Sequence, residues 1–374
     1  MTKDYLKSAL VIICILLSLA GCSEIPEKPE YTKNLFSALE NPYESPLINF
    51  TVLSAGSDIP CAIVIDYNIT FNAEKKRGSS IYSFEGMSNG EHILNISCGK
   101  KEKIINFSVD YTKIKDCIGL QNMKYDYDAD YELADDIDCK ETLLWNQGKG
   151  FEPIGDCGKE DCFSGDENPF TGKFDGKGHV IKKLHIDRPD KNFVGIFGYI
   201  DKTEVKNVGV VDFDVKGKMF VGSLFGWIHH DMLIDNVFAE GNVSAESFSG
   251  ILTGINDGNL TNSRVKGNIV ASGDCIGGLA GYGDGLIINS TSSGTVIGAD
   301  YVGGLTGVLH KGGRTASVYN SYSSADVKGE NYVGGLVGRA EVNTTISNSS
   351  ASGKVESKIK VGRLLGENQN ATII

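Results

Sequence analysis

The sequence predicts an all-β protein in which a right-handed parallel β-helix follows a small antiparallel β-sandwich. A segment that first occurs at Val194 recurs about every 27 residues to the C-terminus, which is the signature of a solenoid. The chain contains 46 glycines but only 8 prolines, and no proline follows Pro189. Glycine permits tight turns, whereas proline removes a backbone donor from a sheet. Short alternating apolar strands with turn residues between them occupy residues 49–112 and predict the sandwich.

The composition argues against a nucleic-acid partner and is compatible with a folded protein. The 48 Asp and Glu residues outnumber the 36 Lys and Arg residues, so the formal charge is −12. We therefore expect no nucleic-acid partner, because such partners select basic surfaces. With 41% hydrophobic residues the chain can bury sizeable cores.

The first 21 residues predict an export signal. Two lysines precede an apolar run at residues 9–20 that is too short for a comfortable membrane span. The run ends in Leu19-Ala20-Gly21-Cys22, which resembles the lipobox of prokaryotic lipoproteins. The resemblance implies that Cys22 becomes the lipid-bearing first residue; the alternative is an ordinary secretory signal. Residues 22–48 combine prolines with scattered charges, as in a flexible tether.

Both interpretations of the N-terminus place the mature chain outside the cytoplasm, and the lipid anchor would hold it at the cell envelope, on the cell surface. Six of the remaining cysteines are disulfide candidates in such an oxidising compartment. Their domain positions favour the pairs Cys61–Cys98, Cys117–Cys139 and Cys157–Cys162. A zinc site that includes the last pair is the alternative. Cys275 directly precedes an apolar repeat position, so we expect a buried and unreactive thiol there.

The strands of residues 49–112 carry Cys61 and Cys98 on different strands. This arrangement resembles the immunoglobulin-like modules of prokaryotic surface proteins, although no tryptophan completes the immunoglobulin core pattern. The resemblance implies an Ig-like β-sandwich that acts as a spacer.

The repeat units define the solenoid. They start at residues 194, 221, 249, 276, 302, 333 and 361, which are 27, 28, 27, 26, 31 and 28 residues apart. We expect three short strands and glycine corners in each coil. An asparagine recurs within each complete unit, and we expect these side chains to stack into a structural hydrogen-bonded ladder: Asn207, Asn236, Asn262, Asn289, Asn320 and Asn348.

The length variation of the repeats falls on one side of each coil. The segment from an asparagine to the next unit start holds 13 or 14 residues, whereas the segment from a unit start to its asparagine varies from 13 to 18. Insertions confined to one side of a solenoid often mark its binding face.

Units such as Val-Gly-Gly-Leu-Val-Gly, at 333–338, resemble the GLUG repeat family, which occurs in surface and adhesin-like proteins and beside some secreted peptidases. The preceding segment also resembles the family in its motifs LADDID, GFEPIG, PFTGKFDGKGHVI and LHI, at 133–138, 150–155, 169–181 and 184–186. The resemblance covers residues 115–374. Two units depart from the pattern, because Ser249 replaces the leading aliphatic residue and Arg363 replaces the second glycine. The arginine puts the regularity of the last coil in doubt.

The expected domain order follows from these features. Residues 1–21 form the lipoprotein signal, 22–48 the tether and 49–112 the Ig-like sandwich. Residues 113–193 form a cysteine-containing cap with the first coils, and 194–374 form the GLUG-repeat β-helix.

The sequence predicts no catalytic residues, no metal and no cofactor. Asp126, Asp128, Asp130 and Glu132 resemble the start of a calcium loop, but the required glycine and bidentate glutamate are missing. No histidine lies in H-E-x-x-H or beside a G-x-S-x-G motif. We also expect no pair of carboxylates at one coil's spacing, as a polysaccharide-cleaving β-helix would need.

Two insertions are candidate binding loops. At the usual strand spacing they lie about 15 Å apart, three coils from each other, which is too far to share a metal ion but compatible with one elongated surface. Ordinary solvated loop charge is the alternative. The residues are His229, His230 and Asp231 in one loop, and His310, Lys311 and Arg314 in the other.

The expected function is that of a non-catalytic, lipid-anchored surface protein. Its partners would be the membrane, through the lipid, and an extracellular polysaccharide or a surface protein, through adhesion or recognition by the β-helix. The alternatives are a structural envelope component without a small ligand and, less favoured, a polysaccharide-active β-helix enzyme.

Overall fold

The structure is a computed structural model of the 374-residue chain. It describes residues 12–17, 48–54, 61–65, 69–73, 78–84, 90–98, 101–109, 112–158, 167–229, 232–312 and 316–374. The chain divides into two compact units, Met1–Lys113 and Ile114–Ile374. Within the described residues, no helix combines the length and the apolar character needed to span a membrane.

The first unit contains two small sheets. One has the order β1-β2-β5, with β1 (Ile12–Leu17) parallel to β2 (Ile48–Ser54) and β2 antiparallel to β5 (Gly78–Phe84). The other is antiparallel in the order β4-β3-β6-β7, formed by β3 (Cys61–Ile65), β4 (Ile69–Ala73), β6 (Gly90–Cys98) and β7 (Lys101–Val109). The register places Cys61 opposite Cys98, and the apolar run expected as the signal core forms β1.

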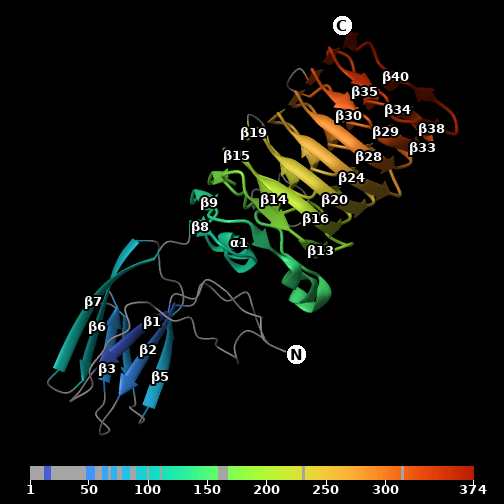
Figure 1. Ribbon diagram of the computed structural model, residues 1–374. Helices are drawn as coiled ribbons and strands as arrows, with labels where there is room; N and C mark the ends of the chain where they lie inside the picture. The colour runs from blue at the N-terminus through green and yellow to red at the C-terminus, as the bar shows by residue number, and fades with distance from the viewer. Residues whose placement is uncertain are drawn as a thin grey trace. The chain divides into compact units, whose positions relative to one another are not determined.

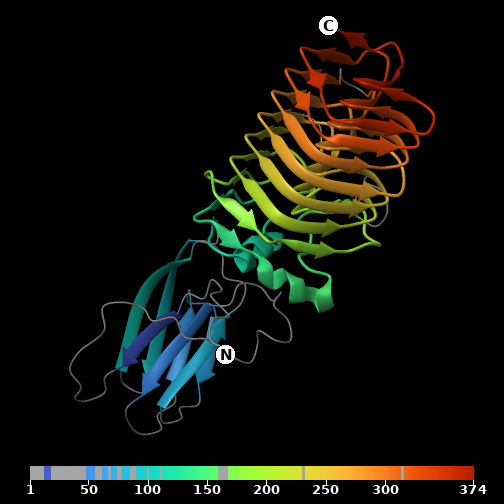
Figure 2. The same cartoon turned by 45° about the vertical axis from the view of Figure 1, so that its right-hand side comes forward.

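The second unit is a parallel β-solenoid, as the repeats predicted, with its strands stacked like the rungs of a ladder (Figures 1 and 2). A regular coil holds about 28 residues, so that Phe197 pairs with Phe225 and Phe225 with Thr253. The expectation of three strands per coil is wrong, because four sheets run along the axis. The additional strands are short and lie at the unit starts, from the unit that begins at Val221 onward.

We number the four sheets I to IV in the order in which a coil visits them. Sheet I has seven strands: β14 (Phe197–Ile200), β18 (Phe225–Ile228), β22 (Thr253–Asn256), β26 (Ala280–Gly283), β30 (Thr306–Leu309), β35 (Val337–Ala340) and β40 (Leu365–Asn368). Sheet II has ten strands: β8 (Lys113–Ile114), β9 (Tyr131–Leu133), β11 (Phe174–Asp175), β15 (Glu204–Lys206), β19 (Leu233–Asp235), β23 (Asn259–Thr261), β27 (Leu286–Ile288), β31 (Ser317–Tyr319), β36 (Thr345–Ser347) and β41 (Thr372–Ile373).

Sheet III contains the longest strands of the solenoid. Its members are β10 (Ile137–Asp138), β12 (Val180–Lys182), β13 (His185–Asp187), β16 (Gly209–Lys216), β20 (Phe238–Ala245), β24 (Arg264–Ala271), β28 (Thr291–Ile297), β32 (Tyr322–Ser323), β33 (Asp326–Gly329), β37 (Ser350–Ala351) and β38 (Val355–Ser357). Sheet IV has six short strands: β17 (Met219–Val221), β21 (Ser247–Gly250), β25 (Ile276–Gly277), β29 (Asp300–Gly303), β34 (Asn331–Gly334) and β39 (Val361–Gly362).

The interior of the solenoid is filled by side chains that alternate along these strands. Phe170, Phe174, Phe197 and Phe225 are fully buried and pack ring against ring, with centroid separations of 4.9 to 5.8 Å. In the following coils Thr253, Ala280, Thr306 and Val337 take the register position of Phe225. All four side chains are buried, so each coil shares its interior layer with its neighbours. Stacking neighbouring coils in this way produces one continuous core.

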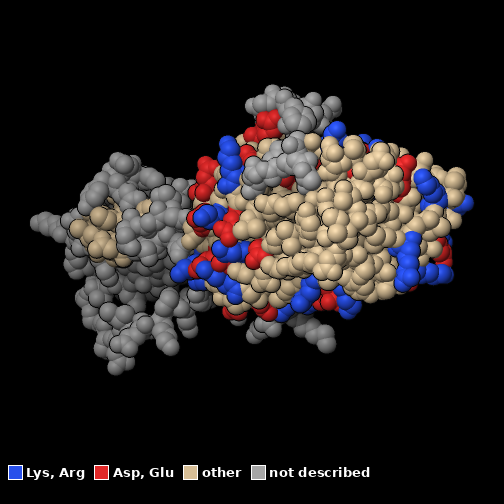
Figure 3. Space-filling model, turned by 90° about the horizontal axis from the view of Figure 1, so that it is seen from above, with Lys and Arg blue, Asp and Glu red and all other residues tan. Residues whose placement is uncertain are grey.

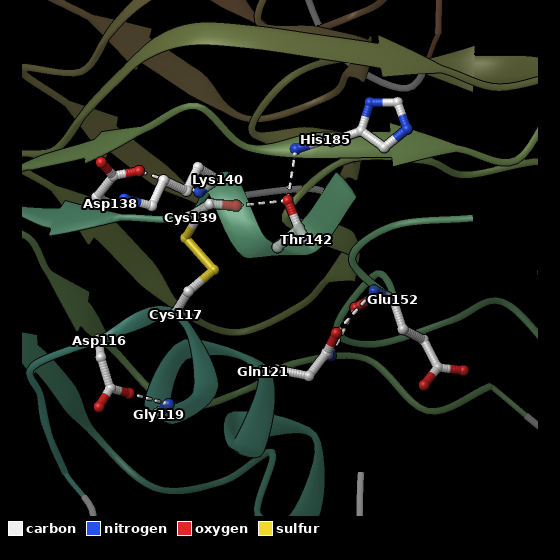
Figure 4. The surroundings of a disulfide bond; sticks show 10 residues. All are labelled: Asp116, Cys117, Gly119, Gln121, Asp138, Cys139, Lys140, Thr142, Glu152 and His185. Carbon is white, nitrogen blue, oxygen red and sulfur yellow. Dashed lines mark hydrogen bonds between the residues drawn. A yellow bond between two sulfur atoms is a disulfide. The ribbon is translucent and has the colours of Figure 1, made fainter. Parts of the chain in front are cut away.

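A cap lies at the N-terminal end of the solenoid (Figure 1) and is cross-linked by the disulfide drawn in Figure 4. It contains α1 (Cys117–Asn122) and the 3₁₀ segments η1 (Met123–Tyr125) and η2 (Lys140–Gly148). Cys117 and Cys139 form a disulfide between them. The Gln121 side chain donates to the Glu152 carbonyl and accepts from the Glu152 N–H, at 2.9 and 2.8 Å. These bonds hold the helix against the first coils and close an end that would otherwise expose an open sheet edge.

Candidate functional site

The length variation between repeats occurs in the connections from sheet I to sheet II. The longest of these connections runs between Leu309 and Ser317, whereas the sheet III strands pair without a break from Phe238–Ala245 to Arg264–Ala271. The structure therefore places the variable segments along one edge of the solenoid, which we call the loop edge. In the view of Figure 3, charged side chains gather along the rims and ends of the visible solenoid face, around a broad uncharged area.

One residue from each of six successive coils forms a column on the loop edge. The column follows directly after the sheet I strands, whose last residues are in register from coil to coil. All six residues carry a carboxylate or an imidazole, and we call them the carboxylate–histidine column: Asp201, His229, Asp257, Asp284, His310 and Glu341. Both candidate loops contribute to it, three coils apart as expected. His230, Asp231 and Arg314 lie outside the described residues.

Neighbouring members of the column bond to each other. His229 Nδ1 lies 2.9 Å from Asp201 Oδ1, and His310 Nδ1 lies 2.9 Å from Glu341 Oε2. The Lys311 N–H also donates to Glu341, so the carboxylate holds the start of the longest loop. The side chains of both histidines are partly exposed, 30% for His229 and 37% for His310.

Two carboxylates occupy the middle of the column on adjacent coils. The Asp284 N–H donates to Asp257 Oδ1 at 3.1 Å, and the Trp227 indole N–H donates to Asp257 Oδ2 at 2.7 Å. Both aspartates are buried. The expectation that no carboxylates recur at one coil's spacing is therefore wrong. Each of the two residues stands in an Asp-Gly pair that directly follows its sheet I strand.

Sequence reasoning missed a second surface feature, a line of aromatic side chains at the unit starts, along sheet IV and the turn that carries Phe193. The residue directly before each unit start is aromatic in five coils, and we call this set the aromatic corner: Phe193, Phe220, Phe248, Tyr301 and Tyr332. All five are half-buried. Phe193 and Phe220 stack with ring centroids 4.6 Å apart, and Tyr301 and Tyr332 stack at 5.1 Å. The signal was present in the sequence, at a fixed offset from each unit start.

The aromatic corner adopts a backbone conformation that bulky residues avoid. Its φ angles lie between 53° and 59°, in the left-handed region. Gly254, in strand β22 of the next coil, lies against this backbone. A Cβ at Gly254 would lie 2.6 Å from the Phe220 Cα. The last glycine of the repeat unit is thus required by close backbone approach.

Cys275 takes the corresponding position in the coil that lacks an aromatic residue there. It is buried, it is the free cysteine among the described residues, and burial raises the pKa of its thiol to about 12. At this coil Tyr282 of sheet I closes the gap, with its ring 5.7 Å from that of Phe248 and 5.0 Å from the His310 imidazole. The aromatic corner and the carboxylate–histidine column therefore meet at Tyr282.

The asparagines lie at another corner, between sheets II and III. They too have positive φ, between 46° and 54°. Asn348 donates to Asn320, Asn320 to Asn289 and Asn289 to Asn262, with Nδ2–Oδ1 distances of 2.8 to 3.2 Å. Asn262 donates instead to Asp235, while Asn236 donates to Asn207 and Asn207 to Asp175. The hydrogen-bonded line therefore runs in two segments, each ending on an aspartate.

A serine line runs beside the asparagines in the later coils. The backbone N–H of Ser290 donates to Ser321 Oγ at 3.1 Å, and that of Ser263 donates to Ser290 Oγ at 3.2 Å. Each hydroxyl donates in turn to the carbonyl two residues earlier in its own coil. The Asn-Ser pairs of the repeat thus satisfy polar backbone groups at a buried turn.

The remaining candidate residues have structural partners or lie outside the described residues. Cys157 is disulfide-bonded, and both Cys22 and Cys162 lie outside the described residues. In the aspartate-rich segment, Asp126 accepts two backbone N–H groups, Asp130 accepts the Lys173 N–H, and Glu132 pairs with Lys177. Within the described part of the chain, no three His, Cys, Asp or Glu side chains are placed to hold a metal ion.

Comparisons with known proteins identify the repeat and several longer relatives. Residues 329–356 match the family described as the GLUG motif. Halomucin of Haloquadratum walsbyi is 32% identical over 241 residues, which are 62% of this chain and 2% of halomucin. A putative Gly-rich membrane protein of Evansella cellulosilytica is 34% identical over 114 residues, 29% of this chain and 12% of that protein.

An immunoglobulin A1 protease of Streptococcus sanguinis is 28% identical over 271 residues, 68% of this chain and 13% of the protease. The chain thus spans a small part of the length of each of these relatives. It is a β-solenoid protein that carries the GLUG motif and is related to segments of much longer proteins.

Proposed function

We propose that this chain is a non-catalytic recognition protein displayed on the cell surface, with an extracellular polysaccharide as the ligand of its loop edge. The observation that carries the proposal is the loop edge itself. It gathers the variable connections and both candidate loops on one side of an otherwise regular scaffold, which is where rigid folds usually carry binding residues. The carboxylates and imidazoles there can accept and donate hydrogen bonds to sugar hydroxyls.

The proposal includes the route to the surface. Residues 1–21 act as a lipoprotein signal, Cys22 carries the lipid, and residues 22–48 form the tether. The first unit is an Ig-like spacer, and the solenoid is right-handed. The names of the relatives support an extracytoplasmic location, since they are halomucin, a putative Gly-rich membrane protein and an immunoglobulin A1 protease.

The anchor can be tested separately from the ligand. Cells that express the Cys22→Ser chain should release the protein from the membrane fraction, whereas the unchanged chain stays with it. Mass spectrometry of the mature N-terminus should find lipid on Cys22. An unmodified N-terminus at another residue would show that the signal is an ordinary secretory one.

The ligand is tested by affinity gel electrophoresis of the chain without residues 1–22, in gels that contain cell-wall or extracellular polysaccharides. We expect retardation in at least one gel, and its loss when the loop between Leu309 and Ala316 is shortened. The matched control replaces Lys266 and Glu240 by serine, because this exposed ion pair of 2.8 Å lies on sheet III, away from the loop edge. No shift in any gel would instead favour a structural envelope component.

The adjacent Asp257 and Asp284 give the enzymatic alternative a specific test. A glycoside hydrolase needs two carboxylates that flank the bond to be cleaved. Under the binding proposal, prolonged incubation with the retarding polysaccharide releases no reducing ends. Release that disappears in the Asp257→Asn chain would replace recognition by catalysis as the function.

A further inference from the structure

The aromatic corner retains bulky side chains at positions where they strain the backbone. A left-handed residue with a Cβ costs roughly 1–2 kcal/mol, and asparagine and glycine tolerate this region best. The same chain uses asparagine at the left-handed positions between sheets II and III. Strained residues that persist in a fold often mark a functional surface. The rings of the aromatic corner are therefore candidates for contact with a partner.

Ring-to-ring contacts connect the aromatic corner with the loop edge. Centroids follow one another from Phe193 to Phe220 at 4.6 Å and from Phe220 to Phe248 at 5.3 Å. Tyr282 and then His310 extend the contacts, so that the line ends beside Glu341. A half-buried apolar line thus runs along the axis and joins the column of hydrogen-bonding groups.

We propose that the two features form one binding strip for an uncharged polysaccharide that lies along the solenoid axis. The strip consists of Phe193, Phe220, Phe248, Tyr282, His310 and Glu341, which lies beside His310. This inference rests on the proposed function and deepens it, because it adds the aromatic corner to the site and excludes anionic ligands.

The chemistry of the strip selects the ligand class. Sugar rings present C–H groups that pack against aromatic side chains, and hydroxyls that donate to carboxylates. Asp201, Asp257, Asp284 and Glu341 give the column a row of negative groups, and the Arg339 guanidinium beside them already pairs with Glu341 at 2.8 Å. A polyanion such as a uronic-acid polymer would face repulsion along this row.

The geometry also favours an extended chain over a compact ligand. The aromatic corner has one ring in each of five coils, and neighbouring parallel strands lie about 4.8 Å apart. The observed centroid steps of 4.6 and 5.3 Å follow this spacing. An extended glycan advances by a similar distance per sugar, so successive sugars can meet equivalent groups on successive coils.

The test uses the chain without residues 1–22 in gels with neutral polysaccharides, with acidic polysaccharides, or with polylysine. The decisive variant is Phe220→Asn with Phe248→Asn, which removes both rings and leaves residues suited to positive φ. The matched control is Phe220→Tyr with Phe248→Tyr, which keeps the rings. Circular dichroism and the urea unfolding midpoint verify that each variant is folded. Asn320→Ala, at the other corner, controls for a general loss of stability.

We expect retardation in a neutral gel, an apparent dissociation constant at least about tenfold higher for the asparagine pair, and little change for the tyrosine pair and for Asn320→Ala. Retardation that survives in the asparagine pair but is lost on shortening the 309–316 loop would overturn the strip while leaving the proposed function intact. Binding only to acidic polysaccharide, or only to polylysine, would overturn the ligand class. No retardation in any gel would overturn both the strip and the polysaccharide proposal.

Discussion

The asparagine corner and the aromatic corner share a backbone conformation and differ in what their side chains do. At the asparagine corner, positive φ is combined with a side chain that bonds to the same residue in the next coil, as between Asn320 and Asn289. At the aromatic corner, positive φ is combined with a ring such as Phe220, which gains only contacts with other rings. The first arrangement suits the backbone, whereas the second strains it.

The difference shows how a repeat separates scaffold from surface. Where a side chain serves the coil stack, the repeat keeps one residue type through all coils, and the hydrogen bonds explain why. At the aromatic corner, where we propose that the side chains contact a ligand, the residue type changes from Phe to Cys to Tyr along the axis. Variation at a fixed structural position is therefore informative about function in this fold.

The largest expected loss of stability comes from placing a side chain where two backbone segments pack closely at the aromatic corner. A valine at Gly254 would place its Cβ 2.6 Å from the Cα of Phe220, and backbone atoms cannot move aside. We expect Gly254→Val to lower the free energy of unfolding by more than about 3 kcal/mol, measured by urea denaturation.

The control for this substitution is Gly119→Ala in helix α1. A Cβ there would meet its nearest neighbour, Asp116 Oδ1, at 3.4 Å, which is an ordinary contact. The variant should be neutral or slightly more stable, because alanine favours a helix more than glycine does. Equal losses in the two variants would contradict the role assigned to the repeat glycines.

Substitutions at the asparagine corner should lower the free energy of unfolding by less. The loss has two separable parts, the lost hydrogen bonds and the backbone strain. Asn320→Ala removes the bonds to Asn289 and from Asn348 and also places an alanine at positive φ. We expect a loss of about 2 kcal/mol in urea unfolding. Asn320→Gly removes the same bonds without the backbone strain, so it should lose about 1 kcal/mol. No difference between Ala and Gly would show that the backbone part is absent.

Removing a hydroxyl from the serine line should lower the free energy of unfolding by a smaller amount. Ser321→Ala leaves the N–H of Ser290 without its hydroxyl acceptor at a buried turn. A loss of about 1 kcal/mol in the unfolding free energy is expected. Ser293→Ala is the comparison, because Ser293 is not fully buried and its hydroxyl makes only a long bond of 3.3 Å. A cost for Ser293→Ala as large as that for Ser321→Ala would argue against the serine line.

The smallest effect at neutral pH concerns Cys275, the exception in the aromatic corner. Because burial raises the pKa of its thiol from 9.0 to about 12, the thiol stays protonated in the fold while the unfolded chain ionises. Its contribution to stability is present below pH 9 and is lost as the pH rises toward 12. Iodoacetamide at pH 8 should modify Cys275 only after denaturation, and Cys275→Ser should remove that signal. Rapid modification of the folded chain would show that the thiol is accessible.

The sequence predicted the parallel solenoid, its coil length and the asparagine positions, because these depend on a repeat that every coil obeys. It did not predict the fourth strand of each coil, since a strand as short as Met219–Val221 leaves no alternating pattern of its own. The aromatic corner was missed because its residue types vary, although Phe220 and Tyr332 have the same offset from their unit starts. The contact between Asp257 and Asp284 was also not predicted. It depends on the register of the strands that precede them, which only the structure establishes.

Side-by-side urea unfolding of Phe220→Asn and Asn320→Ala tests the contrast between the two corners most directly. Phe220→Asn loses ring contacts at 4.6 and 5.3 Å but relieves the strain of an aromatic residue at a φ of 59°. The account predicts a change within about 0.5 kcal/mol for Phe220→Asn, against a loss of about 2 kcal/mol for Asn320→Ala. A loss in Phe220→Asn as large as that in Asn320→Ala would contradict it, because the rings would then serve the scaffold.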